Sequence, residues 1–397
     1  MDWWREKKKK KKRKLERGAK LLEELIECCD GKSNPIKFFS LHQIRKATNN
    51  LNDSNYVFGL SHFYCAWYTG KTESHPMILI KRHNGLFLSL LGLEQGSFCR
   101  DVAISSMVSG HKNFLKLVGC CLEPEDPLMV YHGVKKHDSL DSIISEQPWR
   151  NRMKIAEDIA TALAYLHTAF PRPFVYRTLF PGHILLDADG VAKLSGFSYC
   201  VSIPKGETFV KVYSSYYGDI YKDGKYMRDG IVSVETDVYA IGMLMQKLLN
   251  GFSEVWLDQL FHRITGKKIS DDSIIERFHR ITGKKISDDS IIENEDQRRH
   301  IQNWLFELME EGRMDDIADP KMLEKMGEIS EEELSQMKAF LMLSQRCISE
   351  VEVPTMVEVV KELKKIQRST KNNSSSPSGE TQFESPQDIA SSSQTRL

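Results

Sequence analysis

The apolar residues of this chain change their pattern one third of the way along, and this change limits the folds that the chain can adopt. Residues 38–131 read as short strands with one helix. After them the pattern becomes helical, with six apolar residues at the i, i+3 and i+4 spacing of a helix that has one buried face: Met153, Ala156, Ile159, Ala160, Leu163 and Leu166. A strand-rich segment followed by a helical segment predicts an α+β fold.

Composition narrows the functional classes. The chain has 397 residues, with 55 Lys and Arg against 55 Asp and Glu, so its net charge gives no reason to expect nucleic acid as a partner. No apolar run reaches the roughly 18 residues that span a bilayer, and no secretory signal opens the chain. The eight cysteines include no C-x-x-C pair: Cys28, Cys29, Cys65, Cys99, Cys120, Cys121, Cys200 and Cys347. They predict reduced thiols in a cytoplasmic protein rather than a zinc site or a disulfide framework.

The N-terminus is strongly basic, and residues 1–18 are predicted to form a basic tail. An unbroken basic run begins at Lys7 and ends at Lys14, after Trp3 and Trp4. Such a run can bind an anionic membrane surface with the indoles as interfacial anchors; it can equally be a nuclear-import signal or a solvated tail. A short amphipathic helix is predicted after the run, from four apolar residues at helical spacing: Leu21, Leu22, Leu25 and Ile26.

Two strings in the middle of the chain resemble protein-kinase motifs. The first resembles the catalytic loop H-R-D-x-K-x-x-N-I-L-L-D and reads Tyr176-Arg177-Thr178-Leu179-Phe180-Pro181-Gly182-His183-Ile184-Leu185-Leu186-Asp187. The second resembles D-F-G and reads Gly196-Phe197-Ser198. In kinases the loop Asp accepts the substrate proton, the Lys steadies the transferred phosphate, and the Asn and the D-F-G Asp hold two Mg²⁺ ions.

In this register the residues that perform the chemistry are replaced. The five changed positions, which correspond to the motif's His, Asp, Lys and Asn and to the D-F-G Asp, are Tyr176, Thr178, Phe180, His183 and Gly196. A Thr hydroxyl is too weakly basic to take a proton at neutral pH. Gly offers no ligand, and neutral imidazole suits Mg²⁺ poorly. The resemblance therefore implies a degenerate kinase with no catalytic residues and no metal site.

The nucleotide site is also degraded. Ile78-Leu79-Ile80-Lys81 resembles the V-A-I-K strand, which leaves Lys81 as the one retained nucleotide-contacting side chain, while Leu79 adds bulk near the adenine position. Asp101 on the following helix is the candidate acidic partner of Lys81, and a structural role for this pair is as well supported as a ligand role. The loop that should cradle phosphates keeps one glycine whether it is aligned on Gly59 or on Gly70, so tight nucleotide binding is not expected. Lys81, Asp101 and Gly59 remain as a vestigial site.

Among the motifs that have a structural role, both residues of one ion pair are replaced and one capping Asp is retained. Asp223-Gly224-Lys225-Tyr226 and Val353-Pro354-Thr355-Met356 resemble D-P-E-Y and R-P-T-M, whose Glu and Arg form a buried ion pair in kinases. Lys225 and Val353 replace both partners, which avoids stranding one buried charge. Asp237 in Thr236-Asp237-Val238-Tyr239 keeps the position that, by resemblance, caps the backbone of the catalytic loop.

A further string resembles a signature of plant receptor-like kinases and reads His111-Lys112-Asn113-Phe114-Leu115-Lys116-Leu117-Val118-Gly119-Cys120-Cys121-Leu122-Glu123. The chain as a whole resembles the plant receptor-like cytoplasmic kinases and, within them, the ZED-related pseudokinases. The resemblance covers residues 19–368. It implies a two-lobed kinase-like fold, with a small β-rich N-lobe at 38–131 and a larger helical C-lobe at 132–368. It also implies an adaptor that binds an NLR-type immune receptor and pathogen effectors or effector-modified receptor-like cytoplasmic kinases. Such a protein would be cytoplasmic, at the inner face of the plasma membrane, and without a cofactor.

Two further segments and one alternative complete the expectations. Residues 261–276 recur unchanged as 278–293, and we interpret residues 261–293 as a duplicated loop insert without a function of its own. Residues 369–397 are rich in Ser, Asn, Gln and Pro and are predicted to be disordered.

The leading hypothesis is a catalytically inactive adaptor or decoy in plant innate immunity. The alternative is an atypical kinase that retains Lys81 and binds ATP weakly without Mg²⁺.

Overall fold

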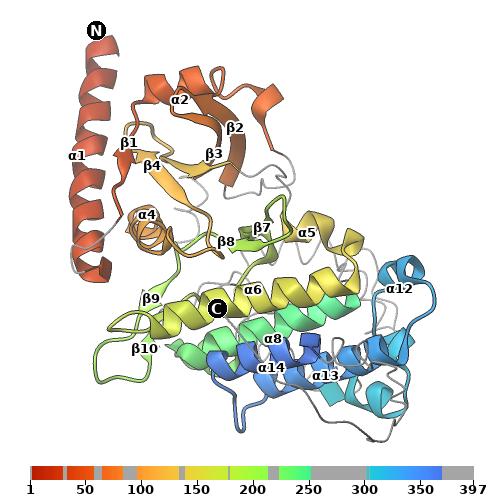
Figure 1. Cartoon of the computed structure of the whole chain (residues 1–397). Coiled ribbons are helices and arrows are strands. Elements are labelled where there is room, and N and C mark those ends of the chain that lie inside the picture. The colour runs from red at the N-terminus through yellow and green to blue at the C-terminus, as the bar shows by residue number, and fades with distance from the viewer. Residues whose placement is uncertain are drawn as a thin grey trace, which may run out of the picture.

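The computed structural model describes residues 2–29, 34–57, 65–83, 96–133, 139–177, 179–212, 223–251, 302–303 and 305–368. These residues form a small part built on a five-stranded sheet and a larger helical part (Figure 1), so the predicted two-lobed α+β fold is confirmed. Gly59, Thr178, the insert at 261–293 and the tail at 369–397 lie outside the described residues. The expectations for them stay predictions.

The N-lobe sheet has the strand order β1-β4-β5-β3-β2. Its strands are β1 (Lys37–Phe38), β2 (Cys65–Thr72), β3 (His75–His83), β4 (Leu117–Cys121) and β5 (Leu128–His132). Successive side chains of β3 point to opposite faces. Leu79 therefore joins the apolar cluster beneath α4 (Gly96–Val108), while Ile78 and Ile80 join the cluster that includes Ile44 of α2 (Leu41–Ala47).

The C-lobe is a helical bundle whose longer helices are α6 (Trp149–Thr168), α8 (Val234–Asn250), α13 (Glu331–Ile348) and α14 (Met356–Arg368). The stripe predicted on α6 is buried in their shared core. Smaller helices are α5 (Leu140–Ile143), α7 (Gly224–Asp229) and α12 (Pro320–Met326). The lobe also holds three antiparallel strand pairs. They are β6 (Phe174–Val175) with β9 (Val201–Ser202), β7 (Ile184–Leu186) with β8 (Ala192–Leu194), and β10 (Val210–Lys211) with β11 (Ile231–Val232).

The N-terminal helix is longer than the short one predicted from Leu21 onward. Helix α1 (Asp2–Cys29) includes the whole basic run and packs crosswise against α4 (Figure 1). Lys, Arg and Glu are good helix formers, so the run continues the helix instead of preceding it. None of the described helices combines the length and the apolar character needed to cross a bilayer.

The positions of the lost ion pair have found other surroundings. Lys225 is exposed and lies 3.4 Å from the carboxylate of Glu235 at the surface. Val353 is half-buried and packs against the core of the C-lobe. At these two positions the C-lobe therefore has an apolar contact at Val353 and a solvated charge at Lys225 in place of a buried ion pair. A deeper ion pair lies elsewhere, between Arg152 and Asp319 at 2.6 Å, and sequence reasoning missed it.

Candidate functional site

The ion pair predicted between Lys81 and Asp101 is present. Lys81 on β3 places Nζ 3.1 Å from Oδ2 of Asp101 on α4, and the two side chains are 4% and 0% exposed. Nζ of Lys81 also lies 5.9 Å from the centre of the Trp67 indole, on the neighbouring strand β2. The ammonium is thus enclosed by a carboxylate and an aromatic face, and it is not presented to solvent.

Asp101 is the meeting point of three chain segments. Its Oδ1 accepts hydrogen bonds from Oγ of Ser105 at 3.2 Å and from the amide of Phe197 at 2.9 Å. Its Oδ2 accepts one from Oγ of Ser198 at 3.3 Å. Burial alone raises the pKa of Asp101, but Lys81, the neighbouring imidazole and the Phe197 amide outweigh it, so the pKa lies below its ordinary value. One carboxylate therefore fixes α4 against β3 and against the irregular segment that follows Gly196.

The adenine position is filled by apolar side chains. Leu79, Tyr131 and Leu185 are each 0% exposed and belong to one cluster that joins strands of the N-lobe to β7 of the C-lobe. The rings of Trp67 and Tyr131 lie 5.6 Å apart in the same cluster. The bulk predicted at Leu79 is therefore part of a closed interior. Trp67 was missed in the sequence, where a lone aromatic after the loop gives no sign of the side that it faces.

The residues that replace the catalytic groups bind one another. Oη of Tyr176 donates to the carbonyl oxygen of Ser195 at 2.6 Å and lies 2.9 Å from Nδ1 of His183. The hydroxyl has a single proton, so we assign the proton of the second bond to Nδ1 of His183. Phe180 is half-buried, with its ring centre 5.8 Å from that of His183.

Gly196 closes the remaining space. Its φ is +82°, and a Cβ added there would lie 2.9 Å from three atoms of the His183 imidazole. The positions of the two Mg²⁺ ligands in the kinase motifs are thus occupied by one ring and one bare backbone packed together. A pair of octahedral Mg²⁺ ions does not fit this donor set. In the described part of the chain, no group of three or more His, Cys, Asp and Glu side chains is placed to hold a metal ion.

The backbone of the loop is nevertheless held as the resemblance implied. Asp237 at the start of α8 accepts hydrogen bonds from the amides of Tyr176 at 2.8 Å and Arg177 at 2.9 Å, and it lies 2.9 Å from Nε2 of His167. Arg177 has a φ of +73° and donates to the Tyr226 hydroxyl at 2.6 Å. The scaffold of a catalytic loop therefore persists around Tyr176, Phe180 and His183.

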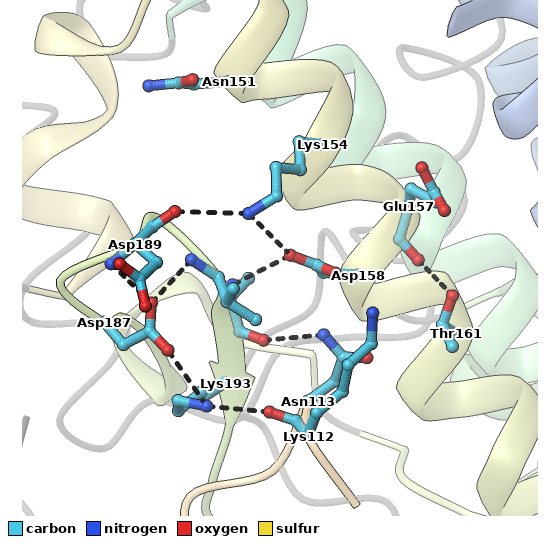
Figure 2. Close-up of polar contacts among 12 residues, drawn as sticks. Lys112, Asn113, Asn151, Lys154, Glu157, Asp158, Thr161, Asp187, Asp189 and Lys193 are labelled. Carbon is cyan, nitrogen blue, oxygen red and sulfur yellow. Dashed lines mark hydrogen bonds and ion pairs between the residues drawn. The ribbon is translucent and has the colours of Figure 1, made fainter. Parts of the chain in front are cut away.

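A second network joins the hairpin of β7, β8 and the loop between them to both lobes. Figure 2 shows Asn113 and Lys112, which precede β4, beside the loop: Nδ2 of Asn113 donates to the carbonyl oxygen of Ala192 at 3.2 Å, and Nζ of Lys193 donates to that of Lys112 at 2.8 Å. On the other side, Asp158 of α6 accepts the amide of Ala192 at 3.1 Å. The network holds the β7–β8 hairpin between the segment that precedes β4 and helix α6.

His83 is a buried base beside the Asp101 cluster. Its Nε2 lies 3.7 Å from Oδ2 of Asp101, beyond hydrogen-bond distance. Burial, with a further contribution from Lys81, lowers the pKa of His83 from 6.5 to about 3. The unfolded chain therefore binds the proton more readily between these values, so stability is complete above pH 6.5 and is lost as the pH falls toward 3.

This gives a pH prediction. Between pH 7.5 and pH 5 the imidazole of His83 is expected to cost the native chain about 2 kcal/mol of unfolding free energy. His83→Leu removes that loss, measured as the difference between urea unfolding curves at the two pH values. The matched control is His42→Leu at an exposed site on α2, which leaves the difference unchanged. An unaltered pH dependence in His83→Leu would show that His83 is not the titrating group.

The two-lobed fold and the loop held by Asp237 are those of a protein kinase. The protein kinase domain family matches residues 92–340. Similar proteins of Arabidopsis thaliana include the inactive serine/threonine-protein kinase ZRK12, 57% identical over 99% of this chain and 89% of the relative. The non-functional pseudokinases ZRK15 and ZED1 are 47% and 36% identical, over 96% and 89% of this chain and 99% and 96% of their own lengths. The chain belongs to the protein kinase family and, within it, to the ZED-related pseudokinase group.

Proposed function

We propose that this chain is a catalytically inactive adaptor or decoy in plant innate immunity, which binds an NLR-type immune receptor and pathogen effectors or effector-modified receptor-like cytoplasmic kinases. The observation that carries the loss of catalysis is the His183 imidazole packed against Gly196. The adaptor role rests on the resemblance to the ZED-related group. It is also supported by the contrast between a closed cleft and a scaffold that still holds its loop through Asp237.

The first test is enzymatic. With Mg²⁺ and ATP, the full chain is expected to transfer no phosphate to itself or to a general protein substrate, because Thr178 replaces the base of the kinase motif and His183 and Gly196 replace its metal ligands. Radiolabel incorporation measures this, and Lys81→Ala is the matched control. Autophosphorylation that disappears in Lys81→Ala would overturn the proposal. A thermal shift with ATP in EDTA that is also lost in Lys81→Ala would favour the alternative, metal-independent ATP binding.

The second part of the same test concerns partners. The full chain, used as bait in plant tissue, is expected to retain a coiled-coil NLR receptor, identified by mass spectrometry against the tag alone. Because the proposal needs a folded surface and no chemistry, Lys81→Ala bait should retain the same receptor at any temperature below its own unfolding transition. Baits that recover only general chaperones in repeated experiments would contradict the adaptor role.

A further inference from the structure

Helix α1 has an inner and an outer face. From Lys10 onward its less exposed residues recur at helical spacing and face the domain: Lys10, Arg13, Arg17, Gly18, Leu21, Glu24, Leu25 and Cys28. The basic run of the sequence is therefore divided between two surfaces. In Figure 1 the helix passes along the outer side of α4, and its N-terminal end extends beyond the sheet.

The C-terminal half of α1 is fixed to both lobes. Leu21 is 1% exposed and lies in the apolar cluster beneath the N-lobe sheet. Glu24 accepts from Arg100 of α4 at 2.9 Å and 3.3 Å. The carbonyl oxygen of Glu27 accepts a hydrogen bond from Arg172, which precedes β6. The helix is thus a rigid extension of the domain.

The middle of α1 is bound by the turn between β4 and β5. Arg17 donates to three carbonyl oxygens of residues 122–125. Arg13 donates to the carbonyl oxygen of Glu123 at 3.2 Å, and Nζ of Lys14 lies 3.9 Å from the Glu123 carboxylate. Arg13 and Arg17 are thus occupied by the domain, while the Lys14 side chain is still 56% exposed.

The outer face keeps most of the lysines. Besides Lys14, five lysines of the run are exposed: Lys7, Lys8, Lys9, Lys11 and Lys12. The pairs Lys9–Glu6 at 3.6 Å and Lys12–Glu16 at 3.7 Å lie in solvent, where they contribute little. Residues 5–17 hold ten basic and two acidic residues in a chain whose net charge is zero. Trp4, 70% exposed, stands at the same end.

We propose that the outer face of α1 binds a membrane surface of anionic phospholipids, with the domain held at a fixed orientation behind it. The concentration of like charge on one solvated face is complementary to such a surface. The exposed indole suits the headgroup region. Because α1 is fixed to α4 and to the β4–β5 turn, the lipid contact sets the direction in which the rest of the chain faces. This surface is independent of the proposed adaptor function.

The test is sedimentation of the full chain with vesicles. We expect the chain to bind phosphatidylcholine vesicles that contain about a third phosphatidylserine, and to bind vesicles of phosphatidylcholine alone weakly. Binding should fall as salt rises from about 0.05 M to about 0.5 M, because the screening length shortens. Each lysine near the surface contributes about fivefold. Changing Lys8, Lys9, Lys11 and Lys12 together to Gln should therefore lower the partition coefficient by at least about a hundredfold.

The matched control changes four exposed lysines on α12 and α14 to Gln: Lys321, Lys325, Lys361 and Lys365. It should bind as the unchanged chain does. Circular dichroism of both variants should show the unchanged unfolding temperature, because none of these side chains is buried. Equal loss in both variants, binding that ignores salt or phosphatidylserine, or displacement of the chain from vesicles by an equal mass of RNA would each overturn the proposal.

Discussion

Asp101→Ala is expected to lower the free energy of unfolding by about 3–5 kcal/mol, which is a large part of the stability of an ordinary domain. The loss arises because Lys81 stays buried without its counter-charge at 3.1 Å. The amide of Phe197 and the hydroxyls of Ser105 and Ser198 lose their acceptor in the same change. Urea unfolding of the full chain measures the difference.

Two further variants separate the charge from the hydrogen bonds. Lys81→Met removes the cation, so the double variant Lys81→Met/Asp101→Ala should be less destabilised than the sum of the two single variants. The matched control is Asp141→Ala, which breaks an ion pair with Lys247 at 2.8 Å on a more exposed carboxylate and should cost less than about 1 kcal/mol. Strict additivity of the first two changes would exclude the buried pair as the cause.

The sequence predicted those parts of the site that depend on one motif each. The strand with Lys81, the helix with Asp101 and the cap at Asp237 keep their places in recognisable strings, so register alone located them. Ser105 lies one helical turn beyond Asp101 and could have been found from that spacing. Ser198 could not, because its contact with Asp101 joins residues from opposite lobes.

The basic run shows the same limit. A charge count treats the residues from Lys7 to Lys14 as one surface, and it gives no acidic partner for any of them. The structure divides them. Arg13 is half-buried against the turn at Glu123, and Lys14 is exposed but lies 3.9 Å from the Glu123 carboxylate, whereas the other exposed lysines of the run lie nearer the N-terminus. The direction of each side chain depends on the docking of Leu21 and Glu24 further along the helix, which lies outside the run.

The degenerate catalytic positions were visible in the sequence one at a time, and their mutual packing was not. Each replacement removes one kinase function by its chemistry alone. Only the fold shows that a Cβ added at position 196 would lie 2.9 Å from three atoms of the His183 ring. The His183 ring therefore opposes the return of a larger motif residue at position 196. If the two losses were independent, each motif residue could be restored without a change at the other position.

Gly196→Asp, which restores the D-F-G carboxylate, is accordingly expected to destabilise the chain by about 3 kcal/mol, from overpacking against His183 and from a side chain at positive φ. Gly190→Asp is the matched control, because Gly190 has a φ of +70° and nothing lies within 4 Å of an added Cβ; it isolates the backbone cost of about 1 kcal/mol.

His183→Asn removes the obstructing ring, so Gly196→Asp/His183→Asn should recover most of the loss while still transferring no phosphate, since Thr178 remains a poor base. Equal costs for Gly196→Asp and Gly190→Asp in urea unfolding would contradict the packing argument. Recovery in the double variant would show that the two metal-ligand positions are now held closed by each other.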